Sequence, residues 1–329
     1  MVTVIIATRN EPLLNKTIEW LYESAGGEIE VIVTLDEPQE VDDRAVVIKN
    51  DKPLGRRVNI NNAAKIAKGE HLFILDAHCK MSKDWDIKMA ESCPEKGIAV
   101  SCIQDMYDDG ELRPGIYQQV YMNKGYEEKW WARKPAEVTE EMMCFTGCSW
   151  MIPKDYFWEC GGYDESLGMY GWDGPEWACK VWMGFGGKVV LRSDVICGHV
   201  FGTNDHNKSY ISSKVKFSEY KKYMTNLYSD KIEAFREKFA PIPNEKEGNK
   251  VTVVEKVDTI ETKQGDLVVK IVRKHYKPYK VQHDGTKSDA EIEEAVLDLI
   301  TEVDYEETVL DAEDFELGPT VTTPAPEDG

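Results

Sequence analysis

The fold is decided by residues 2–35, which have the sequence VTVIIATRNEPLLNKTIEWLYESAGGEIEVIVTL. The stretch begins with a continuous apolar run at residues 2–8, rich in β-branched side chains, which is typical of a strand buried on both faces. Apolar residues then recur at helical spacing over residues 11–24, and a Gly-Gly pair follows them. A second apolar run occupies residues 30–35. Strand, helix and strand in this order predict a βαβ unit and hence a parallel sheet.

The same alternation continues beyond residue 35. Short apolar runs at residues 45–48 and 71–75 predict two further strands, and residues 59–68 predict a helix between them. We therefore expect an α/β chain with a mostly parallel sheet and helices on both faces. Ligands of such sheets bind at the carboxyl ends of the strands. Four polar residues stand at these predicted ends: Thr8, Arg9, Asp36 and Asp76.

The chain is expected to have four regions. Residues 1–205 contain the α/β pattern and a Gly-, Trp- and Cys-rich stretch typical of a structured site. Residues 206–245 have a Lys-rich helical pattern, which predicts a helical extension. Two alternating stretches within residues 246–285 predict a small β-hairpin. Residues 286–329 have the composition of an acidic helix followed by a disordered tail.

The formal net charge of −20 is concentrated at one end of the 329-residue chain. Residues 281–329 hold 16 acidic residues and one lysine, which leaves 44 acidic and 39 basic residues in positions 1–280. The body of the chain is therefore almost balanced in charge. For that reason the overall acidity excludes no class of partner, nucleic acid included.

No stretch reaches the ~18 uninterrupted apolar residues that a membrane-spanning helix requires. The first residues, MVTVIIATRNEP, lack the charged region of a signal peptide. We therefore expect a soluble chain in the cytosol. The eight cysteines form no CxxC pair, which favours reduced, buried thiols. The spacing of Cys144 and Cys148 leaves a metal site or a disulfide as an alternative.

Asp76 and His78 directly follow the strand predicted at residues 71–75. Two residues apart on a strand-end turn, a carboxylate and an imidazole can face one divalent cation, and this pair suits Mn²⁺ or a similar transition metal. Such a cation could neutralise a diphosphate leaving group by Lewis-acid catalysis. The alternative is a solvated aspartate beside an unrelated histidine.

Two blocks of sequence resemble the polypeptide N-acetylgalactosaminyltransferases, within the wider group of family 2-like glycosyltransferases of the GT-A fold. The first is GRRVNINNAAKIAKGEHLFILDAHC at residues 55–79. The second runs from GCSWMIPKDYFWECGGYDES at residues 147–166 to YGWDGPEWACKVWMGFGGKVVLRSDVICGHVF at residues 170–201. The resemblance covers about residues 1–205. It implies a Rossmann-like, nucleotide-sugar-binding GT-A catalytic domain over that range.

The resemblance also implies a ligand for each part of the site. A divalent cation, Mn²⁺ in the first place, would be bound by Asp76, His78 and His199. Asp36 would pair with uracil, although an aspartate beside a proline also suits a turn. Gly55 would place Arg56 and Arg57 toward the diphosphate, or one of these arginines would be solvated. The implied donor-binding residues are Thr8, Arg9, Glu11, Asp36, Gly55, Arg56, Asp76, Gly147, Tyr170 and Trp172.

Asp173 and Glu176 are the catalytic candidates that the resemblance implies. Either acid could orient sugar hydroxyls or accept a proton from the acceptor. Asp173 would also suit the N-cap of the helix that follows it. The chain departs from its relatives at three positions, Tyr170, Gly174 and Gly202, and has no counterpart of their C-terminal carbohydrate-binding domain.

These residues together predict a metal-dependent glycosyltransferase that moves a sugar from a UDP-sugar to an acceptor hydroxyl. The acceptor is a glycan, a protein or modified DNA; basic residues with interleaved tyrosines at 207–224 and 270–280 are compatible with DNA, or form a solvated face. A non-catalytic nucleotide-sugar-binding protein is the alternative. A nucleotidyltransferase is disfavoured because its first loop is rich in glycine, whereas TRNEPLLNK contains none.

Overall fold

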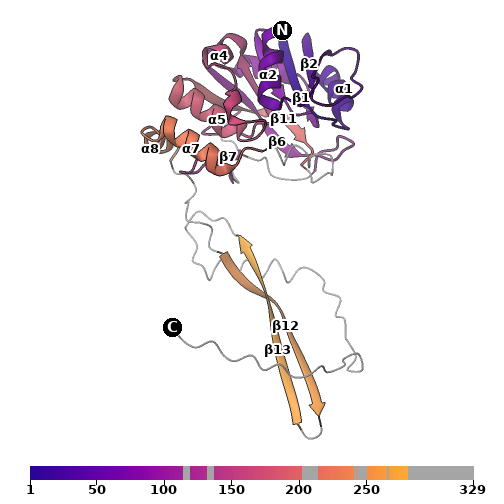
Figure 1. The fold of residues 1–329 in the computed structure, drawn as a ribbon, viewed down its shortest axis with the longest axis vertical. Helices are drawn as coiled ribbons and strands as arrows, with labels where there is room; N and C mark the ends of the chain where they lie inside the picture. The colour runs from indigo at the N-terminus through magenta and orange to yellow at the C-terminus, as the bar shows by residue number, and fades with distance from the viewer. Residues whose placement is uncertain are drawn as a thin grey trace. The chain divides into compact units, whose positions relative to one another are not determined.

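The computed structural model describes residues 1–113, 119–131, 137–201, 214–240, 242, 250–264 and 267–280. The chain divides into two compact units, Met1–Ile242 and Pro243–Gly329. The first unit contains the α/β layers and the second contains one long hairpin (Figure 1). The division falls close to the expected boundary between residues 245 and 246.

Nine strands form the main sheet, in the order β3-β2-β1-β4-β10-β6-β11-β5, with β9 paired to β11. Their bounds are β1 Val2–Thr8, β2 Ile29–Leu35, β3 Val46–Lys49, β4 His71–Leu75, β5 Cys79–Met81, β6 Gly97–Asp105, β9 Thr139–Glu141, β10 Ser149–Pro153 and β11 Lys188–His199. The strands β3, β2, β1 and β4 run parallel to one another, as do β6 and β11. β10 is antiparallel to both neighbours, β4 and β6. The expected mostly parallel α/β sheet is confirmed.

Helices cover both faces of this sheet (Figure 1). Their bounds are α1 Leu14–Ser24, α2 Arg56–Ile66, α3 Trp85–Ser92, α4 Lys154–Glu159, η1 Glu165–Leu167, α5 Asp173–Cys179, the π-helical turn η2 Lys180–Gly184, α7 Phe217–Tyr228 and α8 Ile232–Glu237. A separate two-stranded sheet pairs β7 (Gln119–Met122) with β8 (Glu128–Trp131). None of the helices in the described ranges is long and apolar enough to cross a lipid bilayer.

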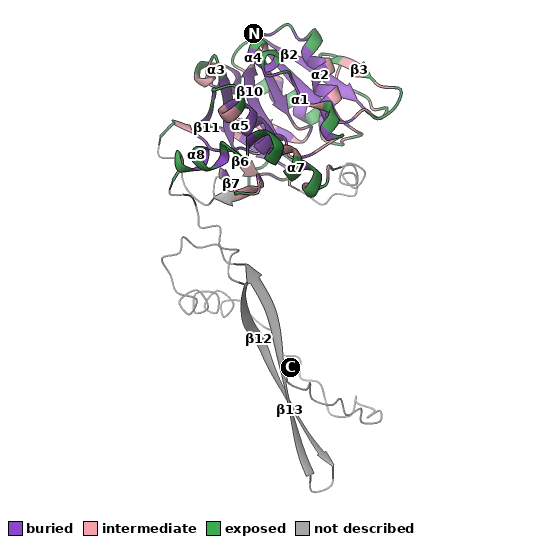
Figure 2. Ribbon diagram, turned by 60° about the vertical axis from the view of Figure 1, so that its left-hand side comes forward, coloured by how far each residue is buried: buried purple, intermediate pink, exposed green. Residues whose placement is uncertain are grey.

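The first strand, β1, contributes to two cores because its side chains alternate between the faces of the sheet. Val4 and Ile6 are buried with residues of α1 and α3 on one face. Ile5 and Ala7 are buried with residues of α2 and α5 on the other. Fully burying a valine or isoleucine side chain contributes about 1.5–3 kcal/mol, so this strand is held from both sides. Figure 2 shows the central strands as buried, as the apolar run predicted.

The helix α7 packs on the same core as α2 and α5. Its buried residues Tyr220, Met224 and Tyr228 recur every four positions and form one apolar stripe. Its opposite side is exposed, as Figure 2 shows. The helical extension expected over residues 206–245 therefore shares the core of the first unit.

The second unit contains β12 (Lys250–Gln264) paired antiparallel with β13 (Leu267–Lys280). This confirms the predicted hairpin, although strands of 15 and 14 residues are longer than the small hairpin expected. The side chains of the basic segment at residues 270–280 lie outside the described ones. The acidic helix and tail expected over residues 286–329 also lie outside the described residues.

All eight cysteines are unpaired, and seven of them are buried. Burial raises the pKa of Cys93 to about 12 and holds that of Cys144 well above its usual range. Thiols of this kind are poor nucleophiles and poor metal ligands. The structure therefore favours reduced, buried thiols over a metal site or a disulfide at Cys144 and Cys148.

Candidate active site

A cavity of about 330 Å³ lies at the carboxyl ends of β1, β4 and β11. This is the edge at which the strand-end residues predicted a binding site. Most of the predicted residues line it: Thr8, Arg9, Glu11, Arg56, Asp76, His78, Gly147, Tyr170, Trp172, Asp173 and His199. Asp36, Gly55 and Glu176 do not line it.

Three of these residues converge as candidate metal ligands. Asp76 and His78 follow β4, and His199 ends β11, which pairs with β5 so that His199 lies opposite Cys79. The Nε2 atoms of the two histidines are 3.1 Å apart, and His199 Nε2 is 3.5 Å from Asp76 Oδ2. One ligand atom from each of the three residues lies within 4.8 Å of the others. Two imidazole nitrogens and one carboxylate form a donor set that suits Mn²⁺.

Glu11 contacts this centre from the loop between β1 and α1. Its Oε2 lies 3.3 Å from Nδ1 of His78. A carboxylate at Nδ1 keeps the proton on that atom and leaves the lone pair of Nε2 free for a cation. Burial lowers the pKa of His78. The hydrogen bond to Glu11 and the charge of Asp76 together raise it by more, so the net shift is upward. Glu11, predicted to bind the donor, thus also orients His78, one of the candidate metal ligands.

Arg56 connects the metal centre with the other end of the cavity. Its Nη1 is 2.7 Å from Asp76 Oδ1, its Nε is 3.1 Å from Asp173 Oδ2, and its Nη2 donates to the carbonyl of Gly147 at 2.9 Å. Burial is the largest single cause and raises the pKa of Asp76, but Arg56, His199 and His78 together lower it by more, so that the pKa lies well below its usual range. The prediction that Arg56 belongs to the donor pocket is compatible with this position.

Asp173 begins α5 and is only 7% exposed. The N-cap position of this helix is Trp172, which has a φ of 66° and makes no side-chain capping bond. The capping alternative for Asp173 is therefore not what the structure shows. Asp173 packs closely against the backbone of Gly147. This requires glycine, because a Cβ at Gly147 would lie 2.7 Å from the Cβ of Asp173.

Glu176 is 1% exposed and faces away from the cavity toward Arg57. The two side chains form a short ion pair, and Arg57 also donates to the carbonyl of Gly171 at 2.8 Å. This placement corrects two expectations. Glu176 is not positioned to act in a transfer reaction, and Arg57 is neither solvated nor turned to a diphosphate. Sequence alone could not separate them from nearby residues of the same charge, since Arg56, next to Arg57, and Asp173, three residues before Glu176, do line the cavity.

Asp36 follows β2 as predicted, but its carboxylate is turned inward. It accepts hydrogen bonds from the backbone N–H groups of Leu54 and Gly55, both at 2.9 Å, and from the amides of Asn50 and Asn59. Three of these donors share Oδ1 and one binds Oδ2, so Oδ2 can accept one further hydrogen bond. In the structure this side chain holds the loop that leads into α2, and its pairing with a base stays a prediction.

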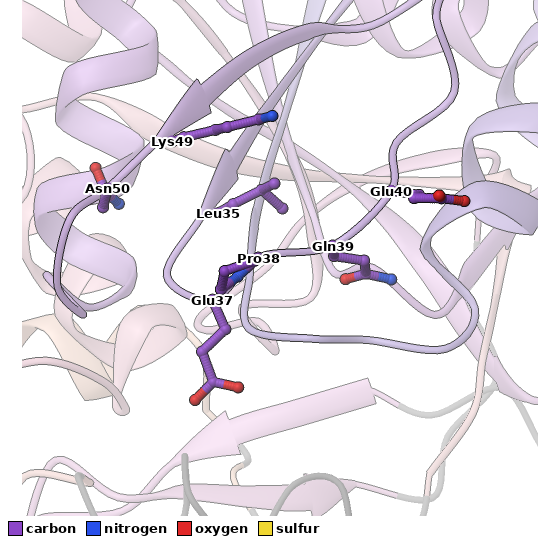
Figure 3. Close-up of a pocket in the computed structure, with 7 residues that line it drawn as sticks. All are labelled: Leu35, Glu37, Pro38, Gln39, Glu40, Lys49 and Asn50. Carbon is purple, nitrogen blue, oxygen red and sulfur yellow. The ribbon is translucent and has the colours of Figure 1, made fainter.

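A second cavity, of about 320 Å³, lies beside the carboxyl ends of β2 and β3 (Figure 3). Its lining is formed by Leu35, Glu37, Pro38, Gln39, Glu40, Lys49 and Asn50. Glu37 pairs with Arg9, with 2.5 Å between Oε1 and Nε, and Arg9 lines the larger cavity. This pair therefore connects the two cavities. Glu37 was missed at the sequence level, although it directly follows Asp36 at a strand end.

Glu128 and Lys214 also line the larger cavity and were not predicted. Glu128 begins β8, and Lys214 precedes α7 with its Nζ 4.3 Å from the centre of the Trp172 ring. Neither residue belongs to a motif, and residues 100–140 have no clear periodicity. No signal in the sequence could have placed Glu128 at the site.

Comparison with known proteins agrees with this geometry. Residues 3–161 match the family model Glycosyl transferase family 2. Human polypeptide N-acetylgalactosaminyltransferase 10 is 24% identical over 166 residues, which are 46% of this chain and 26% of that protein. An uncharacterized glycosyltransferase of Methanocaldococcus jannaschii is 35% identical over 91 residues, 23% of this chain and 31% of that protein. The chain thus spans less than a third of these two relatives.

Among solved structures, the chain resembles GalNAc-T7 in a crystal structure with UDP, GalNAc and Mn²⁺. The TM-score is 0.58 at 19% identity, over 72% of this chain and 50% of that one. At this identity the likeness establishes the fold. The chain thus has the GT-A fold, matches the family 2 glycosyltransferase model over residues 3–161, and resembles the polypeptide N-acetylgalactosaminyltransferases.

Proposed function

We propose that this protein is a metal-dependent glycosyltransferase that moves a sugar from a UDP-sugar to an acceptor hydroxyl. The observation that supports it best is the convergence of Asp76, His78 and His199 in a cavity at the carboxyl edge of the sheet. That edge is where α/β sheets bind nucleotides. The Asp173 carboxylate, held by Arg56, lines the same cavity.

Each part of the cavity has a role in this proposal. Asp76, His78 and His199 would hold Mn²⁺ or another divalent cation, which supplies a Lewis acid for the departing diphosphate. Arg56 adds positive charge beside it, and Thr8 offers a buried hydroxyl without a hydrogen-bond partner in the described part of the chain. The nucleoside would occupy the smaller cavity beyond the Arg9–Glu37 pair.

Asp173 would bind the hydroxyl groups of the donor sugar. An aspartate beside the diphosphate site is suited to this role because a carboxylate accepts hydrogen bonds from two hydroxyls at once. The choice among a glycan, a protein and modified DNA as acceptor stays a prediction. So does the cytosolic location.

Calorimetric titration with UDP, with and without Mn²⁺, tests the proposal. We expect micromolar binding that requires the cation and is lost in Asp76→Ala and His78→Ala. The matched controls are Asp51→Ala, at an exposed loop position, and His71→Ala, at the far end of β4. Controls that bind like the wild type would show that the loss is specific to the centre.

Two results would contradict the proposal in different ways. Absence of UDP binding with any divalent cation would contradict the donor site itself. Cation-dependent binding of UDP without release of UDP from any UDP-sugar would favour the non-catalytic, nucleotide-sugar-binding alternative.

A further inference from the structure

Glu128 differs from the other acids that line the larger cavity. Asp76 and Asp173 pair with Arg56, and Glu11 pairs with His78. The carboxylate of Glu128 has no hydrogen-bond or ion-pair partner in the described part of the chain, and its side chain is half-buried. A half-buried acid that opens into a cavity without a partner is available to a ligand.

The position of Glu128 on β8 is independent of the elements that build the metal centre. β8 pairs only with β7 among the described strands, so Glu128 enters the cavity from a separate two-stranded sheet. The centre itself is formed at the ends of β4 and β11. Glu128 thus lines a part of the cavity wall that is separate from the candidate metal ligands.

The surroundings of Glu128 raise its pKa, so that both its neutral and its charged form are populated near neutral pH. Burial is the largest cause and raises the pKa of Glu128 to about 7; Lys214 lowers it, and the charges of Asp173 and Glu127 raise it further. Three further titratable groups are influenced by its charge: Tyr170, Cys144 and Tyr220. An acid with a pKa near the working pH can both take up and release a proton efficiently.

We propose that Glu128 is the proton acceptor for the acceptor hydroxyl, a role that rests on the glycosyl transfer proposed above. The hydroxyl oxygen forms a bond to C1 of the sugar while the bond from C1 to the diphosphate oxygen breaks. The electron pair of that bond leaves with the diphosphate, and the hydroxyl proton passes to the Glu128 carboxylate. Atoms and charge are balanced in this single step.

Asp173 is less suited to this role because two guanidinium groups hold its carboxylate, although its Oδ1 has no hydrogen-bond partner in the described part of the chain. Arg56 lies 3.1 Å from Oδ2, and Arg57 lies 3.8 Å from Oδ1. Contacts with two guanidinium groups fix the position of this carboxylate and leave it less free to turn toward an acceptor hydroxyl. Glu128 has no such cation in contact with it among the described residues.

A titration that needs no turnover tests the protonation of Glu128 directly. The full chain is labelled with ¹³C at the glutamate carboxyl carbon, and NMR spectra are recorded from pH 3.5 to pH 9 with UDP and diamagnetic Mg²⁺. The resonance missing from Glu128→Gln is expected to titrate near 7. Glu127→Gln is the matched control, since Glu127 is adjacent in sequence and pairs with Lys129. A midpoint near the ordinary value of 4.5 would overturn the proposal.

Turnover gives the second measurement, as UDP released from UDP-glucose, UDP-galactose, UDP-GlcNAc and UDP-GalNAc with water or simple alcohols as acceptor. Glu128→Gln is expected to lower kcat by about 10²–10⁴-fold, to remove the acidic limb of the pH profile, and to leave the Kd for UDP unchanged. Glu127→Gln is expected to behave as the wild type. A wild-type chain that turns over none of these donors contradicts the glycosyl transfer and, with it, the role of Glu128.

The two proposals fail in distinguishable ways. A wild-type chain that does not bind UDP with any cation contradicts the glycosyl transfer and, with it, this role. A chain that binds and turns over a donor while Glu128→Gln keeps the wild-type kcat and pH profile contradicts the role of Glu128 alone.

Discussion

The guanidinium of Arg56 and the carboxylate of Asp76 form an ion pair, with 2.7 Å between Nη1 and Oδ1. The same guanidinium contacts Asp173 and the carbonyl of Gly147. One side chain at the start of α2 therefore fixes the distance between the candidate cation ligand and the acid at the start of α5. Both carboxylates depend on Arg56 for charge balance in a site where Arg56 is only 5% exposed.

Arg56→Met should destabilise the fold because it removes the nearest cation from two carboxylates, those of Asp76 and Asp173. Removing one partner of a buried ion pair costs about 3–5 kcal/mol. Urea unfolding followed by tryptophan fluorescence measures the change. Arg44→Met is the control, since Arg44 and Asp42 form an exposed pair for which at most about 1 kcal/mol is expected. Equal effects in the two variants would contradict the special position of Arg56.

Glu11→Gln should weaken cation binding without unfolding the protein. The glutamine amide can turn its N–H toward Nδ1 of His78, so the proton is no longer held on Nδ1. Loss of such a hydrogen bond to a metal-binding histidine lowers metal affinity about 10–100-fold. Mn²⁺ titration monitored by electron paramagnetic resonance gives the affinity. Glu19→Gln, an exposed position on α1, should leave it unchanged. Wild-type affinity in Glu11→Gln would show that His78 needs no such support.

Glu176→Gln should affect stability and not catalysis. It leaves the Arg57 guanidinium buried without its carboxylate, so we expect a loss of about 3–5 kcal/mol in the free energy of unfolding. UDP binding by the fraction that remains folded should match the wild type, because Glu176 does not line the cavity. A stable variant with normal UDP binding and lost turnover would instead restore Glu176 as a catalytic residue.

Gly55→Ala should be more harmful than its backbone angle alone predicts. Gly55 has a φ of 85°, and an added Cβ would lie 2.6 Å from the Cβ of Met169. Gly186→Ala is the matched control, since Gly186 also has a positive φ, of 64°, but nothing lies within 4 Å of its added Cβ. The control should lose about 1 kcal/mol from strain and Gly55→Ala clearly more. Thermal or urea unfolding of both variants compares them, and equal losses would contradict the close packing on Met169.

The raised pKa of Glu128 has a consequence for stability. An acid whose pKa is about 7 in the folded state and 4.5 in the unfolded state makes the folded state bind more protons between these values. Its contribution is therefore fully present below pH 4.5 and is lost as the pH rises through 7, by at most about 3 kcal/mol. Glu128→Gln should remove this slope from unfolding free energies measured between pH 5 and pH 8. A wild-type slope in the variant would assign it to another group.

The part of the site that the sequence predicted is the part built at strand ends. Asp76 stands at such an end, because parallel strands bring their carboxyl ends to one edge whatever their separation in sequence. His199 was predicted only from the family resemblance, and the structure places it beside Asp76. Asp36 also stands at a strand end, yet its carboxylate faces inward, and so does that of Glu176 on α5, which only the resemblance had implied. Which of two adjacent polar side chains faces the cavity depends on local partners such as Leu54 and Arg57, which no periodicity reveals. Glu128 was invisible for a different reason, since its hairpin has no repeat and no motif.

The indole of Trp172 has consequences for how much of the chain a working site requires. Its Nε1 donates to the carbonyl of Val215 at 3.0 Å, and its ring stacks on Tyr220 of α7 at 5.1 Å between centroids. Trp172 directly precedes Asp173, so these contacts anchor the start of α5 from the C-terminal side. A fragment ending at residue 205 would retain every motif and lose this anchor. The smallest active fragment therefore has to extend through α7.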